Sequence, residues 1–179
     1  SMCTECRKYY PEFRVSINLS YVQILKSPLM MELKQIIEHS GISCSGIIVE
    51  LTESGYLEGT PAVRSVWNDM KKLRIQIALD DFGTGYSNLM NISNLEPDIV
   101  KLDRGFTLKA LSRSYEYQLM QYVIEMVHKL NQYVCVEGVE TKEDLEKIKA
   151  LGPDLIQGYY YSKPCSRDEF LKKFFGYSE

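Results

Sequence analysis

Two adjacent carboxylates mark the place where the sequence concentrates chemistry. Asp80 and Asp81 end a run of apolar, β-favouring residues that begins at Ile75, and the glycine-containing segment 82–87 follows them. This pattern predicts a strand that opens into a loop directly after two negative charges. A divalent cation would remove their repulsion, and oxygen donors without histidine or cysteine favour Mg²⁺ or Mn²⁺. The simpler alternative is an aspartate that caps a helix beginning near Ser87.

Other short apolar runs in the sequence repeat this arrangement. Each carries one polar residue between apolar neighbours, close to the end of the run, and the set is Asn18, Glu50, Asp80, Lys101, Glu137 and Gln157. Side chains alternate between the two faces of a strand, so the apolar neighbours would pack under helices while the polar residues face the other way. The repetition therefore predicts one polar site assembled from the ends of several strands.

Strand and helix patterns alternate along the chain, and they predict the framework for this site. Apolar runs predict strands at 13–19, 47–51, 75–80, 97–102, 133–137 and 155–157. Helical patterns predict the end of a helix near 3–10, a short helix after residue 80, and helices at about 27–40, from 61 onward, 114–130, 142–150 and 167–174. Strand followed by helix over about six units predicts an α/β protein with a parallel sheet.

Two parallel architectures fit that order, an open sheet and a closed barrel. An open doubly wound sheet usually carries a glycine-rich phosphate turn, and the sequence has none. A (β/α)₈ barrel gathers its chemistry at the carboxyl ends of its strands, where the polar residues occur. The sequence therefore favours a TIM-type (β/α)₈ barrel, here incomplete because only about six βα units are found where a closed barrel needs eight strands.

Length, composition and charge narrow the class of protein. With 179 residues, 45% of them apolar, the chain is long enough to form one globular domain. It contains no run of about 18 apolar residues and no signal-peptide pattern, so we expect this fragment to make no membrane contact. The net charge of −3 is dispersed, which argues against a nucleic acid polymer as a partner.

The five cysteines are odd in number and scattered, which favours a reduced, cytoplasmic protein. Cys3 and Cys6 have the spacing of a redox or zinc pair. No second pair or nearby histidine follows, so two thiols on a helix are the better interpretation. His39 and His128 both fall in helical patterns, and we interpret them as helix-surface residues rather than metal ligands.

The segments around the polar strand ends can be compared with known families. They are Ser16-Ile-Asn-Leu-Ser20, Glu50-Leu-Thr-Glu-Ser54, Asp80-Asp-Phe-Gly-Thr-Gly-Tyr-Ser87, Lys101-Leu-Asp-Arg104, Glu137-Gly-Val-Glu-Thr141 and Gln157-Gly158. Together, and in this order over nearly the whole chain, they resemble the EAL-domain cyclic di-GMP phosphodiesterases. The resemblance implies an eight-stranded barrel that uses two Mg²⁺ or Mn²⁺ ions to hydrolyse one phosphodiester of cyclic di-GMP, giving linear pGpG.

The resemblance also implies roles for individual residues. The implied metal ligands are Asn18, Glu50, Asp80, Asp81 and Glu137, with Asp80 shared between the two ions. Lys101 would lie beside the attacking water, although it could instead simply form a salt bridge with the carboxylates. Glu53 would hold the loop that follows Asp81, or would be an ordinary carboxylate at a helix N-terminus. Glu140 and Gln157 would contact water or support the ligands.

One departure from the family pattern stands out. The family takes its name from a Glu-Ala-Leu tripeptide whose glutamate is a metal ligand, and this tripeptide is absent from the sequence. We therefore expect residues 1–179 to be an EAL-type domain that lacks its N-terminal part and is weakly active or inactive by itself. The alternative is a non-catalytic cyclic di-GMP receptor or protein-interaction module on the same fold. A Glu-Ala-Leu strand upstream would favour the enzyme.

An interrupted barrel has consequences for partners. It would leave two sheet edges and part of its interior open, so a homodimer is a further expectation. A sensor or diguanylate-cyclase domain could precede this region in the parent protein, as it does in relatives. A missing region could also anchor the parent protein to a membrane, while the fragment itself is expected in the cytoplasm.

Overall fold

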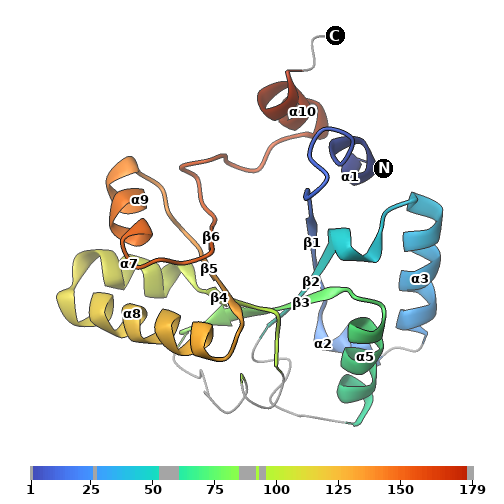
Figure 1. Ribbon diagram of the computed structural model, residues 1–179, viewed down its shortest axis with the longest axis horizontal. Coiled ribbons are helices and arrows are strands. Elements are labelled where there is room, and N and C mark those ends of the chain that lie inside the picture. Colours follow the sequence, from blue (N-terminus) through green and yellow to red (C-terminus); the bar gives the residue numbers. More distant parts are fainter. Residues whose placement is uncertain (1, 26–27, 53–60, 85–91, 93–95, 177–179) are drawn as a thin grey trace.

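The fold is built on a parallel sheet that runs in chain order. The structure, a computed structural model, describes residues 2–25, 28–52, 61–84, 92 and 96–176 (Figure 1). Within these ranges six parallel strands pair in the order β1-β2-β3-β4-β5-β6. Their bounds are β1 Val15–Asn18, β2 Ile47–Thr52, β3 Gln76–Phe82, β4 Ile99–Leu102, β5 Tyr133–Val136 and β6 Leu155–Ile156. The predicted α/β class and incomplete barrel are confirmed.

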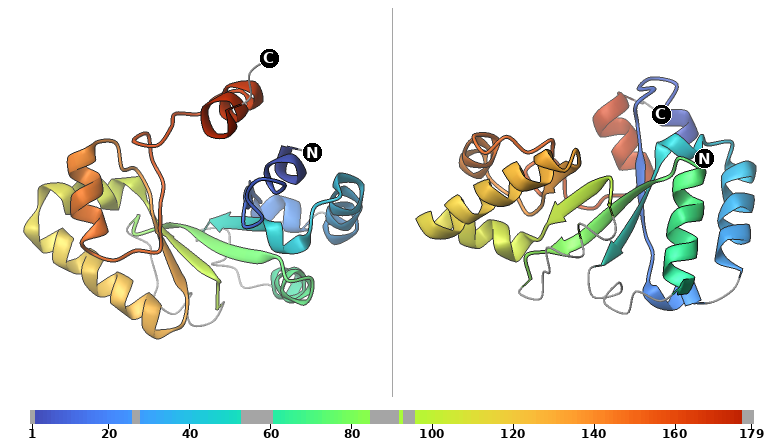
Figure 2. Two further views of the ribbon diagram at one scale, coloured as in Figure 1. Left: turned by 45° about the horizontal axis from the view of Figure 1, so that its top comes forward. Right: turned by 60° about the horizontal axis from the view of Figure 1, so that its bottom comes forward.

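The helices of the described ranges lie around this half-barrel (Figures 1 and 2). They are α1 Met2–Cys6, α2 Tyr21–Leu25, α3 Leu29–Ser40, α5 Pro61–Lys72, α7 Arg104–Ser112, α8 Ser114–Lys129, α9 Lys142–Lys149 and α10 Arg167–Phe175, with a 3₁₀ turn η1 at Cys44–Gly46. Figures 1 and 2 show α2, α3 and α5 on the side of β1–β3, and α7, α8 and α9 on the side of β4–β6. Within the described ranges, no helix is both long and apolar enough to cross a bilayer.

Two helices, α2 and α7, were not predicted from the sequence. The α7 helix begins where it does because the Asp103 carboxylate accepts hydrogen bonds from the backbone N–H groups of Gly105 and Phe106 at its first turn. The predicted short helix after residue 80 lies outside the described residues. The helix predicted from residue 27 begins at Leu29.

The strands divide their side chains between two apolar clusters, as the alternation predicted. The main core lies between the sheet and the helices, and its strand residues include Val49, Leu51, Ile77, Leu79, Val100, Leu102, Val134 and Val136. A second, smaller cluster consists of Ile48, Ala78, Ile99 and Cys135. Each member of the second cluster stands two residues before Glu50, Asp80, Lys101 or Glu137. Since two residues is the strand period, the polar residues share the inner face and form a layer above the apolar one.

Strand β3 extends further than predicted. The apolar pattern predicts an end at Asp80, but in the structure the strand continues through Asp81 to Phe82. The pairing of β3 with β4 shifts register between Leu79 and Phe82, and Asp81 has a φ of 60°. A bulge of this kind re-aims side chains, and aspartate tolerates positive φ better than most residues. Asp81 therefore belongs to a bulged strand end rather than to the following loop.

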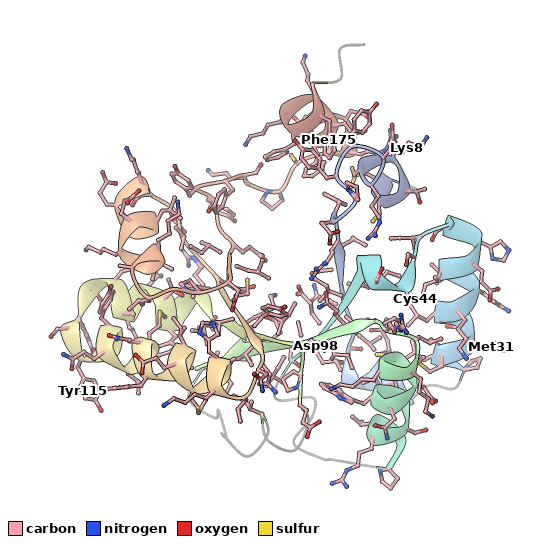
Figure 3. All side chains as sticks on the ribbon, viewed as in Figure 1. Lys8, Met31, Cys44, Asp98, Tyr115 and Phe175 are labelled. Atoms are coloured by element: carbon pink, nitrogen blue, oxygen red, sulfur yellow. The ribbon has the colours of Figure 1, made fainter. Side chains whose placement is uncertain are left out.

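The two ends of the described chain meet across the open side of the sheet. Arg167 of α10 pairs with Glu5 of α1 at 2.6 Å. Behind this ion pair, aromatic rings of the two ends pack edge to face, among them Tyr10 and Phe13 against Phe175. Figure 2 shows α1 and α10 adjacent, and Figure 3 shows Phe175 on α10 at this contact. Cys3 and Cys6 lie buried on α1, so the prediction of two thiols on a helix is confirmed.

Two aspartates hold the beginnings of strands together. Asp98 accepts a hydrogen bond from the backbone N–H of Ile77, and Asp154 accepts one from that of Val134, both at 2.8 Å. Asp154 also lies 2.9 Å from His128 Nε2. Each aspartate follows a proline and precedes a strand, so one local motif ties two pairs of neighbouring strands.

We expect Asp154→Ala to lower the free energy of unfolding by about 1–3 kcal/mol, because the buried N–H of Val134 loses its charged acceptor. Urea unfolding followed by circular dichroism would measure this change. Glu146→Ala, an exposed acidic position on α9, is the matched control, with a change within about 0.5 kcal/mol. Equal effects of the two substitutions would contradict the role given to Asp154.

Candidate active site

The centre of the site is the ammonium group of Lys101 on β4. Its Nζ atom lies 2.7 Å from Glu50 Oε2, 2.9 Å from Asp80 Oδ1 and 2.7 Å from Glu137 Oε1. The side chains are 6% exposed for Lys101, 8% for Glu50, 13% for Asp80 and 18% for Glu137. Four residues predicted from separate strand ends therefore form one partly buried ionic cluster.

Burial and charge act in opposite directions within this cluster. Burial tends to lower the pKa of Lys101, but hydrogen bonds to Glu137, Glu50 and Asp80 outweigh burial and raise that pKa above its usual range. Burial raises the pKa of Glu137, and the hydrogen bond with Lys101 opposes this rise. One ammonium thus faces three carboxylates, and the cluster keeps an excess of negative charge.

Asp81 lies at the rim of the cluster. Its side chain is exposed, in contrast to that of Asp80. Partial burial raises the pKa of Asp81 first, and the charges of Asp80 and Asp103 raise it further, while Lys101 opposes them. Asp81 directly follows Asp80 on β3 and adds a further carboxyl group beside the cluster. Asp103, which caps α7, was not singled out from the sequence, although it stands in the quoted segment after Lys101.

Asn18 and Gln157 occupy the two outer strands. Asn18 pairs with Glu50 in the register of β1 and β2, and Asn18 is exposed. Gln157 directly follows β6, is also exposed, and lines a cavity that Lys101 lines as well. Both residues lie at the carboxyl ends of their strands, on either side of the cluster. The structure does not describe Glu53, so its predicted role lies outside the described residues.

Glu140 has a partner that was not predicted from the sequence. Arg104, at the first turn of α7, donates two hydrogen bonds to Glu140 Oε1, at 2.7 Å from its terminal nitrogen and 3.2 Å from Nε. The two side chains, 58% and 38% exposed, line a hollow of about 380 Å³ together with Glu137, Gln157 and Tyr159. Glu140 is therefore placed at the mouth of the site beside a cation. The signal that could have identified Arg104 was its place in the segment that begins at Lys101.

A cavity of about 400 Å³ extends below the ionic cluster along the inner face of the sheet. Its walls include the apolar layer of the strands and, from α10 and the segment before it, Tyr161, Phe170 and Phe174. Cys135 lies in this wall, and burial raises the pKa of its thiol to about 12. A neutral buried thiol is a poor nucleophile at neutral pH. The chemistry of the site therefore rests on carboxylate, amide and ammonium groups.

A curved parallel sheet with carboxylates and a lysine at its carboxyl-terminal edge is the arrangement of a barrel enzyme. The EAL domain family matches residues 1–164, and the chain belongs to that family. It is 32% identical over 160 residues to the cyclic di-GMP phosphodiesterase PdeF of Escherichia coli K12, covering 89% of this chain and 21% of PdeF.

Solved structures agree with this assignment. The EAL enzyme Bd1971 in a form bound to cAMP and cyclic di-GMP has a TM-score of 0.89 and 29% identity, covering 96% of this chain and 47% of that chain. The EAL domain of Mycobacterium smegmatis DcpA has a TM-score of 0.86 and 26% identity, covering 98% of this chain and 81% of that domain. The chain spans about a fifth of the length of the first curated relatives that it matches.

Proposed function

We propose that this chain is most of the catalytic domain of a phosphodiesterase that hydrolyses cyclic di-GMP to linear pGpG. The observation that carries the proposal is the convergence of Glu50, Asp80 and Glu137 on Lys101 in a member of the EAL family. Buried carboxylates in such numbers are costly unless cations neutralise them, and one lysine supplies a single positive charge. PdeF, similar in sequence, is named a cyclic di-GMP phosphodiesterase.

The donor set of the site fits divalent cations. The residues that would hold them are Asn18, Glu50, Asp80, Asp81 and Glu137, which offer only oxygen donors, as Mg²⁺ and Mn²⁺ prefer. Bound there, the cations would acidify an attacking water and offset the negative charge that develops on the phosphoryl oxygens. Among the described residues, no group of three or more acidic, histidine or cysteine side chains is already arranged around an open metal position. The carboxylates instead face Lys101.

The chain's own residues have separate roles in the proposed reaction. Lys101 keeps its proton at neutral pH, so its ammonium can orient the attacking water and favour its deprotonated form. Glu140 and Gln157, at the mouth of the site, would contact water or support the metal ligands. Arg104 pairs with Glu140 at 2.7 Å and brings a guanidinium group to the hollow where a phosphate-bearing ligand would enter.

Nucleotide hydrolysis tests the proposal directly. The chain and a longer chain that begins upstream, each with Mg²⁺ or Mn²⁺, are incubated with cyclic di-GMP, and pGpG is measured by chromatography. We expect slow or absent release from residues 1–179 and metal-dependent release from a longer chain that carries a Glu-Ala-Leu strand. A longer chain that binds cyclic di-GMP and never cleaves it would favour the receptor instead.

The extent of the domain is part of the proposal. We take residues 1–179 to be an EAL-type domain without its N-terminal part, inside a longer protein in which a sensor or diguanylate-cyclase domain can precede it. The five free cysteine thiols agree with a cytoplasmic location for this part.

We expect residues 1–179 to self-associate in solution. In the described sheet, β1 and β6 each pair with one neighbour, and parallel strands with free edges tend to acquire partners. Sedimentation velocity at increasing protein concentration would show a rising mean mass. A compact monomer that binds little of an apolar dye at high concentration would rule out this expectation.

Divalent cations should stabilise the fold. Because a ligand favours the state that binds it, Mn²⁺ at about 100 times its dissociation constant should add roughly 2.7 kcal/mol to the free energy of unfolding. Asp80→Asn should reduce this gain, since it removes a carboxylate of the cluster. Thermal unfolding with and without Mn²⁺, together with titration calorimetry, would measure both effects. No Mn²⁺ binding at millimolar concentration, or unchanged binding by Asp80→Asn, would show that the cluster is not a metal site.

A further inference from the structure

The ammonium group of Lys101 lies where a bound metal ion could lie, among carboxylates from three strand ends. An ammonium group has three N–H bonds, and three carboxylates from three different strands surround this one at 2.7–2.9 Å. The lysine side chain is only 6% exposed, so bulk water hydrates its charge poorly. Its hydrogen-bonding capacity is fully used by these carboxylates.

The carboxylates depend on that charge. Glu50, Asp80 and Glu137 would otherwise repel one another at the inner edge of the sheet, with side chains no more than 18% exposed. They lie on or directly after β2, β3 and β5, three strands whose relative positions the ammonium helps to hold. An exposed lysine contrasts with this arrangement, since Lys72 pairs with a single carboxylate, Asp69, and its side chain is 75% exposed.

The carboxylates that surround Lys101 are among the residues that would hold a divalent cation. Glu50 Oε2, Asp80 Oδ1 and Glu137 Oε1 each accept from or contact the Lys101 ammonium. A divalent ion at the inner edge of the sheet would meet the ammonium at close range, where two positive charges repel strongly. Binding of these carboxylates to the Lys101 ammonium therefore competes with binding of the same carboxylates to a metal ion.

We propose that Lys101 is a tethered counter-ion, which holds the three carboxylates together while no divalent cation is bound and releases some of their oxygen atoms when one binds. This proposal rests on the metal site of the proposed function. It assigns Lys101 a positioning role that is separate from orienting the attacking water. Released from one or two carboxylates, the ammonium would still remain within the cluster, because Lys101 is anchored in the middle of the sheet.

The test uses Lys101→Met, which keeps the length and apolar stem of the side chain and removes its charge. Binding of Mn²⁺ alone, without nucleotide, is measured by titration calorimetry on residues 1–179, and thermal unfolding is followed with and without Mn²⁺. We expect the variant to unfold at a lower temperature without metal. We also expect it to bind Mn²⁺ at least tenfold more tightly than the parent chain and to gain more in unfolding temperature from Mn²⁺.

Lys72→Met is the matched control, because it removes an exposed lysine that pairs with one carboxylate. It should change neither the Mn²⁺ affinity nor the gain in unfolding temperature. If Lys101→Met does not fold without metal, the double variant Lys101→Met with Glu137→Gln removes one charge of each sign. This double variant should fold, and it should bind Mn²⁺ more tightly than Glu137→Gln alone; equal or weaker binding would overturn the proposal.

The outcomes separate this inference from the proposed function. A lysine that is only an ordinary structural ion pair predicts the fall in unfolding temperature but no tighter Mn²⁺ binding. Equal or weaker Mn²⁺ binding by Lys101→Met would therefore contradict the counter-ion role of Lys101 without contradicting the metal site. Absence of Mn²⁺ binding by both chains would overturn the counter-ion together with the metal site.

Discussion

Asp81→Asn, introduced into a longer chain that also carries a Glu-Ala-Leu strand, is expected to lower the turnover of cyclic di-GMP by about 10²–10⁴-fold. Nucleotide affinity should change much less. Asp81 is exposed at the rim of the cluster, and its carboxylate is close enough to Asp80 and Asp103 for their charges to raise its pKa. Through bound cations, its charge would therefore stabilise the transition state more than the bound nucleotide. Interactions that strengthen only in the transition state raise turnover rather than affinity.

Lys101→Ala should behave in the same way, since it removes the ammonium that would orient the attacking water. Chromatography of pGpG gives the turnover, and calorimetry with cyclic di-GMP gives the affinity. Asp69→Asn, a surface carboxylate of α5 paired with Lys72, is the matched control and should leave both quantities unchanged. Full turnover by Asp81→Asn would remove Asp81 from the site.

Gly158→Ala is expected to destabilise the fold by about 3 kcal/mol, a large value for the addition of one methyl group. A Cβ atom at Gly158 would lie 2.0 Å from the backbone oxygen of Val139 and 2.5 Å from its nitrogen. The backbone of Val139 cannot move aside for this Cβ atom as easily as the end of a flexible side chain could. The segments after β5 and β6 would have to separate, and the hydrogen bonds from Val139 N to Gln157 O and from Tyr160 N to Val139 O would be lost.

Gly152→Ala provides the control for this substitution. Gly152 has a φ of +76°, and a Cβ atom there would meet nothing within 4 Å. Its cost should be about 1 kcal/mol, the penalty for a side chain in the left-handed region. Urea unfolding of both variants separates the two causes. Equal costs would show that close packing of the segments after β5 and β6 does not restrict position 158.

The division of each strand into an inner and an outer face followed from the sequence. Glu50, Asp80, Lys101 and Glu137 were predicted to face away from the helices, and they meet on the inner face of the sheet. Alternation is a local steric property of extended chain, so neighbouring residues are sufficient to reveal it. The α/β class and the incomplete barrel followed for the same reason, because strand and helix patterns are local.

Local caps made some helix boundaries predictable, but α7 was missed although Asp103 caps it. The predicted helix at 142–150 corresponds to α9, Lys142–Lys149, whose Thr141 and Asp144 form a capping box. The α2 and α7 helices were missed. The bulge at Asp81 was also missed, because it arises from a register shift between β3 and β4 that involves residues 20 or more positions apart.

The sequence left open whether Lys101 pairs with the carboxylates, and the tertiary structure decided that it meets three of them. Lys101 lies 51 residues from Glu50 and 21 from Asp80, and Arg104 lies 36 from Glu140, so no local pattern links these pairs. The sequence by itself determined that polar side chains stand at the carboxyl ends of the strands, since residue type and strand alternation depend only on neighbouring residues. That three carboxylates converge on one ammonium depends on strand order and stagger, which long-range packing sets.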